Sequence, residues 1–257
     1  MSCLMGKRLP LQRLLPTERP LLFLTMYHAF HPFTPDHYAT LLIGFGTLAV
    51  LIVMGRHGGR LRQVASCLLT FCCLSAYPLS QAAWLSFDID QSLDNQLPLH
   101  LCDIAAFIAG FAMITRKPLL CTLTYFWGLA ATVQALLTPA IPVGFPAWPY
   151  ITFFVQHFAI VGVALYLPIV QGWRPLTPWW KSPLIAYGWI LIYLFIVMII
   201  NRVLHSNFGF ATHPPENPSL IDHLGPWPWY LVSMSGIALM LFLFLALPFT
   251  RSSARAK

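Results

Sequence analysis

The 257-residue chain contains 58% hydrophobic and only 9% charged residues, and its mean hydropathy is +0.68. An ordinary soluble domain has about 25% charged residues, so this chain has too few charges to cover a water-exposed surface. The composition excludes a water-soluble enzyme, a disordered chain and a collagen-like chain, and it predicts a polytopic membrane protein. The net charge of +7 does not indicate a nucleic-acid partner, because the basic residues lie in short loops and at the termini.

Seven segments are apolar over roughly the 20 residues that a helix needs to cross a bilayer. They are approximately 38–55, 64–87, 98–115, 118–138, 150–170, 183–204 and 229–249. The alternating pattern of a β-barrel is missing, and helices satisfy every backbone polar group in lipid. The predicted fold is therefore all-α, a membrane helical bundle of seven transmembrane helices over residues 31–250.

Basic residues in the connections predict the orientation of the bundle. They follow spans 1, 3 and 5 and fill the tail 251–257, whereas the opposite connections carry acidic residues or no charge. By the positive-inside rule, the C-terminus is cytoplasmic and the N-terminus lies outside. The basic residues that set this orientation are Arg56, Arg60, Arg62, Arg116, Lys117, Arg174, Lys181, Arg251, Arg255 and Lys257.

Residues 1–30 form an N-terminal extension whose charge conflicts with this orientation. Three interpretations compete: a tolerated basic segment, a poor signal peptide, or a mis-assigned start with translation beginning at Met26. The apolar run Leu21–Leu24 is short for a signal peptide and prolines interrupt the segment, so we favour Met26. The extension carries Lys7, Arg8, Arg13 and Arg19 against the single acid Glu18.

Polar side chains inside the predicted spans gather at one depth. Ionisable groups within a membrane are costly and usually have a purpose. In the predicted orientation, the polar groups of spans 3 to 6 fall in the outer part of each helix, and the inner halves hold almost none. We therefore expect one polar chamber that opens toward the outer leaflet. Its candidate residues are His100, Cys102, Asp103, Gln134, Gln156, His157, Asn201 and His205, with Asn217, Asp222 and Trp227 in the adjoining outer loop and lip.

Structural interpretations of these residues remain open. His100 and Asp103 are three residues apart on one helix face, so they are able to form an ion pair. Asn201 and His205 are four apart and are able to pair in the same way. Gln134 fits a hydrogen bond between neighbouring helices.

Cys102 is the candidate nucleophile among the cysteines. A cysteine in an apolar helix often only packs. Cys102 differs from the other cysteines of the spans because it lies at the polar depth near a helix N-terminus, whose positive dipole end favours a thiolate. His100 is not its obvious base, since it lies about 200° around the helix from Cys102.

Trp227 fits either an interfacial aromatic belt or the lip of the chamber.

Several runs of residues occur in a recognisable order. They are PLHLC from Pro98, YFWGL from Tyr125, QALLTP from Gln134, PENPSL from Pro215 and LGPWPWY from Leu224. Together they resemble the YwaF-like family of bacterial integral membrane proteins, which is related to the eukaryotic transmembrane protein 164. The resemblance extends from about Phe30 to Phe249, and the opening "PF(S/T)…H" of that family matches Pro32–Thr34 and His37, which agrees with a start at Met26.

The resemblance implies an activity and the residues that perform it. The eukaryotic relatives are described as acyltransferases that move a fatty acyl chain between phospholipids through a cysteine and a histidine. Carried onto this chain, these residues are Cys102 and His157. The resemblance also implies a phospholipid partner, no cofactor and a multi-pass protein of the bacterial plasma membrane. Ala140 departs from the pattern, because many relatives have an acid after the LLTP run.

The first functional hypothesis is thus a lipid acyltransferase or acyl hydrolase that uses a covalent cysteine mechanism. Cys102 attacks the acyl ester while His157 takes and returns the proton. The oxyanion needs preorganised donors. The candidate donors are Gln134, Asn201 and His100, and the candidates that orient the histidine are His205 and Asp103.

The second hypothesis is a non-enzymatic transporter, receptor or small-solute binding protein. Histidine and aspartate in a membrane are able to relay protons. Against a transporter stands the absence of visible inverted repeats. A metal site made of His100, Asp103, His157 and His205 lacks tight ligand spacing, so we expect no bound metal.

Overall fold

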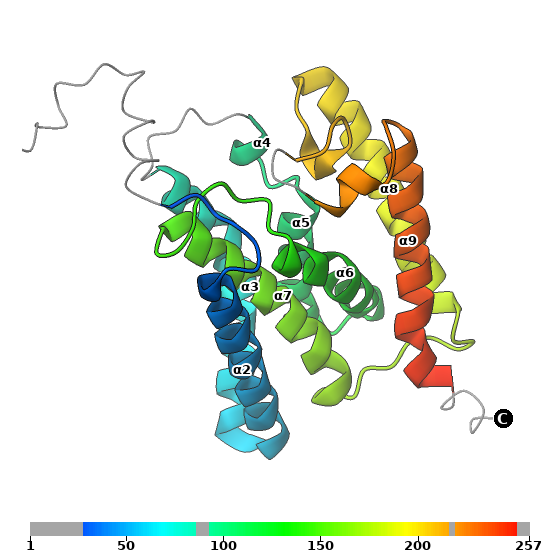
Figure 1. Cartoon of the computed structure of the whole chain (residues 1–257). Coiled ribbons are helices and arrows are strands. Elements are labelled where there is room, and N and C mark those ends of the chain that lie inside the picture. Colours follow the sequence, from blue (N-terminus) through cyan, green and yellow to red (C-terminus); the bar gives the residue numbers. More distant parts are fainter. Residues whose placement is uncertain (1–27, 86–92, 216–218, 251–257) are drawn as a thin grey trace, which may run out of the picture.

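The computed structural model describes residues 28–85, 93–215 and 219–250, and within them long helices occupy all seven segments predicted as spans (Figure 1). The N-terminal extension with Met26, the residue Asn217 and the basic tail 251–257 lie outside the described residues. The long helices are α2 (Pro35–His57), α3 (Gly59–Leu85), α5 (Leu101–Thr115), α6 (Pro118–Leu137), α7 (Trp148–Ile169), α8 (Lys181–Leu204) and α9 (Trp229–Ala246).

Short helical turns fill the connections. They are α4 (Leu93–Gln96), η2 (Phe208–Phe210), η3 (Leu220–His223) and η4 (Leu247–Phe249). An antiparallel bridge between Ala29 and Val143 ties the segment before α2 to the α6–α7 connection. The all-α prediction is confirmed for the described ranges.

Six of the seven long helices have the length and apolarity to cross a membrane, and α5 is the shorter one. Its 15 residues extend about 22 Å, less than the ~30 Å of a bilayer's hydrocarbon core. It begins at Leu101 rather than at the predicted residue 98, because His100 is the extended N-cap residue with ψ 147°. Pro98 and Leu99 therefore precede the helix as irregular chain.

Proline and left-handed residues set several helix ends. Pro35 and Pro118 occupy the first turns of α2 and α6, where proline costs no helical hydrogen bond. Gly58 separates α2 from α3 with φ 79°, a conformation that glycine adopts without strain. Arg116 ends α5 in the left-handed region and donates its N–H to Ala112 O at 2.9 Å. The α2–α3 and α5–α6 connections are consequently very short.

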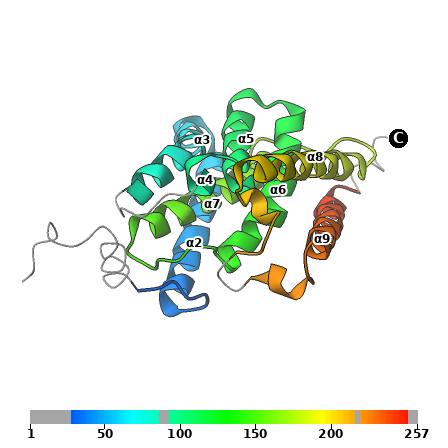
Figure 2. The ribbon, with the colours of Figure 1, turned by 90° about the horizontal axis from the view of Figure 1, so that it is seen from above.

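Helix α7 lies at the centre of the bundle and packs against α2, α3, α5 and α6. On its other side, α6 also contacts α8 and α9, which pair with each other. Seen from above, α2 and α3 lie toward one side of the molecule and α9 lies toward the other (Figure 2). Gly128 of α6 permits the close approach of α7, because a Cβ there would lie 3.0 Å from the Cβ of Ala164.

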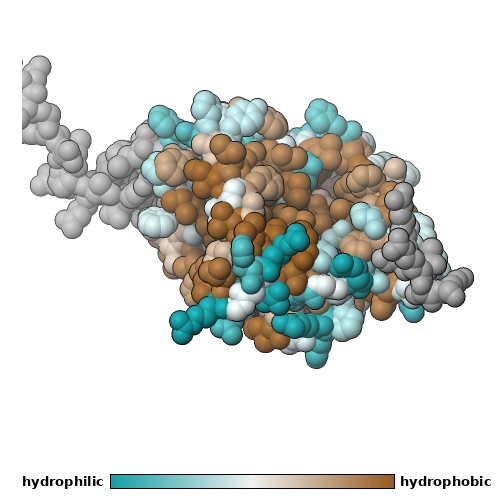
Figure 3. All heavy atoms as spheres, turned by 90° about the horizontal axis from the view of Figure 1, so that it is seen from below, coloured by the Kyte–Doolittle hydropathy of each residue, from teal (hydrophilic) through white to brown (hydrophobic). Residues whose placement is uncertain are grey.

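The short connections that carry the basic residues meet at one end of the bundle. The Arg62 guanidinium donates to Gly55 O across the α2–α3 turn at 2.9 Å, and Tyr166 near the end of α7 donates to Arg62 O at 3.3 Å. Gln171, just after α7, donates to the Met113 sulfur near the end of α5 at 3.4 Å. Viewed from below, hydrophilic residues gather in a patch on an otherwise largely hydrophobic surface (Figure 3).

Candidate functional site

Asp103, in the first turn of α5, is the residue on which the polar side chains converge. The buried Gln156 of α7 donates its amide hydrogen to Asp103 Oδ1 at 2.9 Å. His100, the residue that caps α5, interacts with the same carboxylate electrostatically. Asp103 is half-buried. The predicted spans 3 and 5 are therefore joined by side-chain contact at this depth.

Two tyrosines that sequence reasoning did not single out complete this cluster. Tyr77 of α3 and Tyr193 of α8 both lie near Asp103. Tyr193 donates its hydroxyl to Leu99 O at 3.0 Å, and Tyr77 donates to Gln96 O, in the chain that leads into α5. Four helices, α3, α5, α7 and α8, thus contribute polar groups to one cluster.

Cys102 lies directly before Asp103; the residue as a whole is half-buried, and its thiol is surrounded by protein. Backbone N–H groups of Cys102 and Asp103 interact with the sulfur, and Tyr193 lies within electrostatic range of it. A helix N-terminus concentrates unpaired N–H groups and the positive end of the helix dipole. The helix terminus favours negative charge on the Cys102 sulfur, whereas burial of the thiol and the adjacent Asp103 carboxylate oppose it. Cys73 and Cys121 are buried within helices.

His157 is buried in α7 with only 2% of its surface exposed. Its Nδ1 lies 2.7 Å from Phe153 O, and its ring stacks on the Phe153 ring with centroids 3.9 Å apart. A carbonyl oxygen only accepts hydrogen bonds, so Nδ1 carries the proton and Nε2 of the neutral ring keeps its lone pair. The contact with Phe153 therefore fixes the tautomer that a general base requires at Nε2.

The Asp103–Gln156 hydrogen bond sets the register of α5 against α7. Cys102 precedes Asp103 by one residue, and His157 follows Gln156 by one residue. The two helices run in the same direction, so these neighbours differ in depth by about 3 Å at a rise of 1.5 Å per residue. Cys102 and His157 accordingly occupy nearly the same level of two packed helices.

The loop after α8 covers the start of α5. Gly209 of η2 directs its backbone N–H to His100 Nδ1 at 3.5 Å, a long contact. The His100 ring also packs edge-on against Phe208 and beside Phe210, with centroid distances of 5.5 and 5.8 Å. The His100 imidazole therefore faces the η2 loop, and it lies near the Asp103 carboxylate.

The N-terminus of α5 lies inside the bundle, level with the middle of α8. Leu99 accepts its hydrogen bond from Tyr193, which lies near the middle of the 24-residue helix α8. Irregular backbone at membrane depth is tolerated where protein buries it or where it lines a polar cavity. The residues before α5 meet this condition, because α8 and η2 cover them. The positive end of α5 is consequently directed into the cluster around Asp103.

Three of the candidate residues take part in local structure instead. Asn201 accepts hydrogen bonds from Phe208 N and Ser206 Oγ at 2.8 and 3.0 Å, and it donates to Phe208 O at 3.0 Å. His205 is exposed and ends α8 in the left-handed conformation with φ 52°. Gln134 donates to Thr138 on its own helix at 3.1 Å. Asn201 and His205 therefore do not share one site, although they lie four residues apart.

The candidate residues of the outer loop organise that loop. Asp222 is exposed, and its carboxylate accepts the N–H of Ser219 at 2.7 Å at the start of η3. Trp227 is 56% exposed and donates its indole N–H to Ala211 O at 3.1 Å. This bond ties the segment before α9 to the loop that follows η2.

A metal centre finds no support in the described part of the chain. Over residues 28–85, 93–215 and 219–250, no three His, Cys, Asp or Glu side chains are grouped so that they could hold a metal ion.

The six long apolar helices define a multi-pass integral membrane protein. The chain belongs to the TMEM164 family, whose family model matches residues 32–246. No curated protein and no solved structure gives a significant match. The matched range contains the whole Asp103 cluster, together with Cys102 and His157.

Proposed function

We propose that this protein is a phospholipid acyltransferase or acyl hydrolase in which Cys102 is the nucleophile and His157 is the general base. The observation that carries this proposal is the Gln156–Asp103 hydrogen bond, which joins α5 and α7 so that Cys102 and the buried imidazole of His157 lie at nearly the same depth. The Nδ1 contact of His157 with Phe153 O supports it further, because it leaves Nε2 as the basic nitrogen.

The first half-reaction forms an acyl-enzyme. His157 Nε2 removes the thiol proton as the Cys102 sulfur attacks the carbonyl carbon of the acyl ester. The negative charge that develops on the carbonyl oxygen is stabilised at the positive end of α5, near the N–H of Cys102. The C–O bond of the ester then breaks, and the imidazolium returns its proton to the departing lysophospholipid oxygen. The products are a thioester on Cys102 and a lysophospholipid.

The second half-reaction distinguishes transfer from hydrolysis. In transfer, the hydroxyl of a second lysophospholipid attacks the thioester; in hydrolysis, water does so. His157 takes the proton of the attacking hydroxyl in either case, and the released Cys102 sulfur recovers it. His100 and Asp103 act in this proposal as positioning residues, because they connect the start of α5 to η2 and α7.

The test uses purified full-length protein in lipid nanodiscs with a phospholipid whose acyl chain is isotopically labelled and with an unlabelled lysophospholipid. Mass spectrometry follows the labelled chain into new phospholipid or free fatty acid. Cys102→Ala is expected to abolish both products, and a thioester adduct is expected on the peptide that contains Cys102 in the unmodified protein. Full activity in Cys102→Ala would end the covalent mechanism.

Cys72→Ala is the matched control for this experiment. Cys72 is half-buried like Cys102, but it lies within α3 and outside the Asp103 cluster. Its replacement by alanine is expected to leave product formation unchanged. An equal loss in both variants would indicate a general effect of removing a cysteine rather than a role for the Cys102 thiol.

A second candidate function is a non-enzymatic solute-binding or transport protein. The observation that favours it is that the Asp103 carboxylate, rather than the Cys102 thiol, accepts the hydrogen bond from Gln156 of α7, with Tyr77 of α3 and Tyr193 of α8 near it. A carboxylate surrounded by hydroxyl and amide groups is suited to bind a proton or a cationic solute. Solute-dependent thermal stabilisation that disappears in Asp103→Asn, without any acyl product, would favour this function over the enzyme.

We also propose that all seven long helices cross the membrane, with α5 as a short span, the N-terminus outside and the C-terminus in the cytoplasm. The basic connections at one end of the bundle support this orientation. A place in the bacterial YwaF-like branch and in the bacterial plasma membrane remains part of the same proposal.

A further inference from the structure

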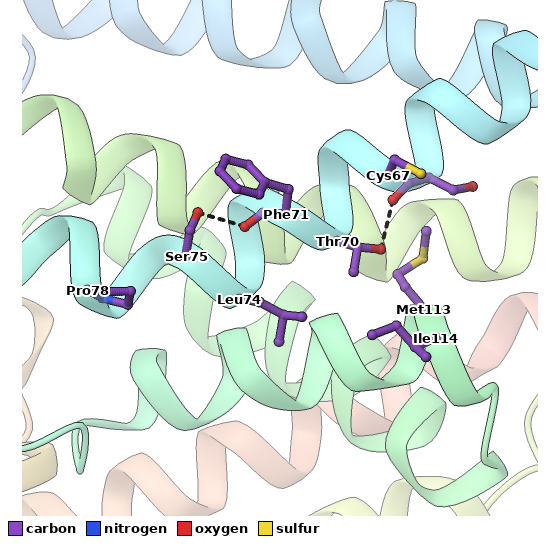
Figure 4. A pocket seen from close by; sticks show the side chains of 9 residues that line it. Cys67, Thr70, Phe71, Leu74, Ser75, Pro78, Met113 and Ile114 are labelled. Atoms are coloured by element: carbon purple, nitrogen blue, oxygen red, sulfur yellow. Dashed lines mark hydrogen bonds between the residues drawn. The ribbon is translucent and has the colours of Figure 1, made fainter.

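A shallow groove of about 730 Å³ lies between α3 and α5. Its α5 side is formed by Met113 and Ile114, at the opposite end of that helix from Cys102. Leu74 of α3 projects toward these residues, and Cys67 and Phe71 line the same helix surface (Figure 4).

The polar atoms in the groove wall are already paired within the protein. Thr70 and Ser75 donate their hydroxyls to Ser66 O and Phe71 O on their own helix, at 2.8 and 2.7 Å. Ser66 Oγ shares a hydrogen bond with the Tyr166 hydroxyl at 3.0 Å. The wall therefore offers mainly carbon and sulfur to an occupant. Such a surface suits a hydrocarbon chain better than a solute that needs hydrogen bonds.

The groove has the length and the depth of one membrane leaflet. From Ser66 to Pro78, the wall on α3 extends about 18 Å, slightly more than half of the ~30 Å hydrocarbon core. Ser66 lies about two turns from Gly59, where α3 begins at the basic end of the bundle. The groove consequently opens toward the leaflet on the basic side, whereas Cys102 lies at the other end of α5.

Basic residues that have no acidic neighbours in the sequence lie at this end of the groove. Arg60 precedes Cys67 by seven residues, so both lie on nearly the same face of α3. Arg116 and Lys117 follow Ile114 at the end of α5, and all three basic residues are exposed. The sequence contains no Asp or Glu over 37–87 or 104–215, which include all three connections at this end.

We propose that the α3–α5 groove binds one acyl chain of an anionic phospholipid from the leaflet on the basic side, with Arg60, Arg116 and Lys117 holding its phosphate. The apolar wall and the adjoining unbalanced positive charge together match the two parts of such a lipid. The charged end of this site lies at the opposite end of α5 from Cys102, so either proposal is able to fail while the other stands.

Native mass spectrometry of the full-length protein tests the head-group preference. The detergent-purified chain is titrated with phosphatidylglycerol or with phosphatidylcholine of the same acyl chains. Phosphatidylglycerol is expected to bind more tightly, and Arg116→Gln or Lys117→Gln is expected to weaken it by about fivefold each. Arg202→Gln is the matched control, because Arg202 lies in the last turn of α8 at the other end of the bundle, and it is expected to change nothing.

Two variants at Cys67 test the groove itself. Cys67 is exposed, so Cys67→Trp fills the groove without disturbing the core, and it is expected to abolish phosphatidylglycerol binding, while Cys67→Ala retains it. The unfolding temperature of each variant, measured alongside, separates lost binding from lost structure. Equal affinity for the two lipids, or unchanged binding in both the charge variants and Cys67→Trp, would overturn the proposal. Loss of a dimer peak in Cys67→Trp with lipid binding unchanged would also overturn it, by assigning the groove to a second copy of the chain.

Discussion

The Gln156–Asp103 hydrogen bond joins the parts of α5 and α7 that carry Cys102 and His157. Its contribution to the free energy of unfolding is measurable. Gln156→Leu removes the donor and leaves the carboxylate without this partner. A double-mutant cycle with Asp103→Asn is expected to give a coupling energy of about 1 kcal/mol in thermal unfolding, as for other hydrogen bonds between membrane helices. Gln134→Leu is the control, because the Gln134 amide bonds to its own helix. A coupling energy near zero would show that the bond does not hold α5 against α7.

Individual residues also show how much of the site could be predicted from the sequence. The convergence of His100, Asp103 and Gln156 follows from hydropathy and orientation, because few polar groups lie at that depth. Tyr77 and Tyr193 could not be predicted, since a tyrosine in an apolar helix fits packing equally well. Asn201 and His205 have helical spacing, yet the hydrogen-bond partners of Asn201 are loop groups whose positions depend on the folded η2 segment.

The buried contacts of His37 give a physical reason for the histidine in the opening sequence motif. Its ring is fully buried: Nδ1 accepts the N–H of Phe33 at 2.9 Å, and Nε2 consequently donates to Leu136 O at 2.9 Å. The histidine of the opening "PF(S/T)…H" pattern therefore fastens the start of α2 to the end of α6. Its role in the structure is to join these elements rather than to act in the Asp103 cluster.

At the scale of elements, Gly209 of η2 packs against Tyr193 of α8 and contacts His100 at the start of α5. A Cβ at Gly209 would lie 2.7 Å from the Tyr193 hydroxyl, and the residue has φ 64°, which costs an alanine about 1–2 kcal/mol. Gly209→Ala is expected to lower the unfolding temperature and to reduce acyl transfer. Adding Tyr193→Phe is expected to recover part of the stability, because it removes the nearest clashing atom. A fully stable Gly209→Ala protein would contradict the close fit of η2 against α8.

The helices were predictable because each is a long apolar run bounded by proline, glycine or charge. The start of α5 was not, since Pro98 and Leu99 are as apolar as the residues of the helix itself. Only the cover provided by α8 and η2 permits these residues to remain extended within the bundle. Hydropathy reports how apolar a segment is, but it does not report which neighbouring segments bury its backbone.

At the scale of the whole molecule, the segregation of charge predicts which end of the bundle faces the cytoplasm. In a variant with its native cysteines replaced by alanine, a thiol introduced by Asp36→Cys is expected to react with a membrane-impermeant maleimide in intact cells. A thiol introduced by Lys117→Cys is expected to react only after the membrane is permeabilised, because Lys117 lies at the basic end. The reverse pattern of labelling would invert the proposed orientation.

The pairing of α8 with α9, and their packing against α6, has a consequence for biosynthesis. The first five long helices contact one another extensively, so they are able to assemble before the ribosome has delivered the last two. Tyr193 and Gly209, which close over the start of α5, belong to this late C-terminal pair. In a nascent chain the start of α5 would thus stay uncovered until translation is nearly complete.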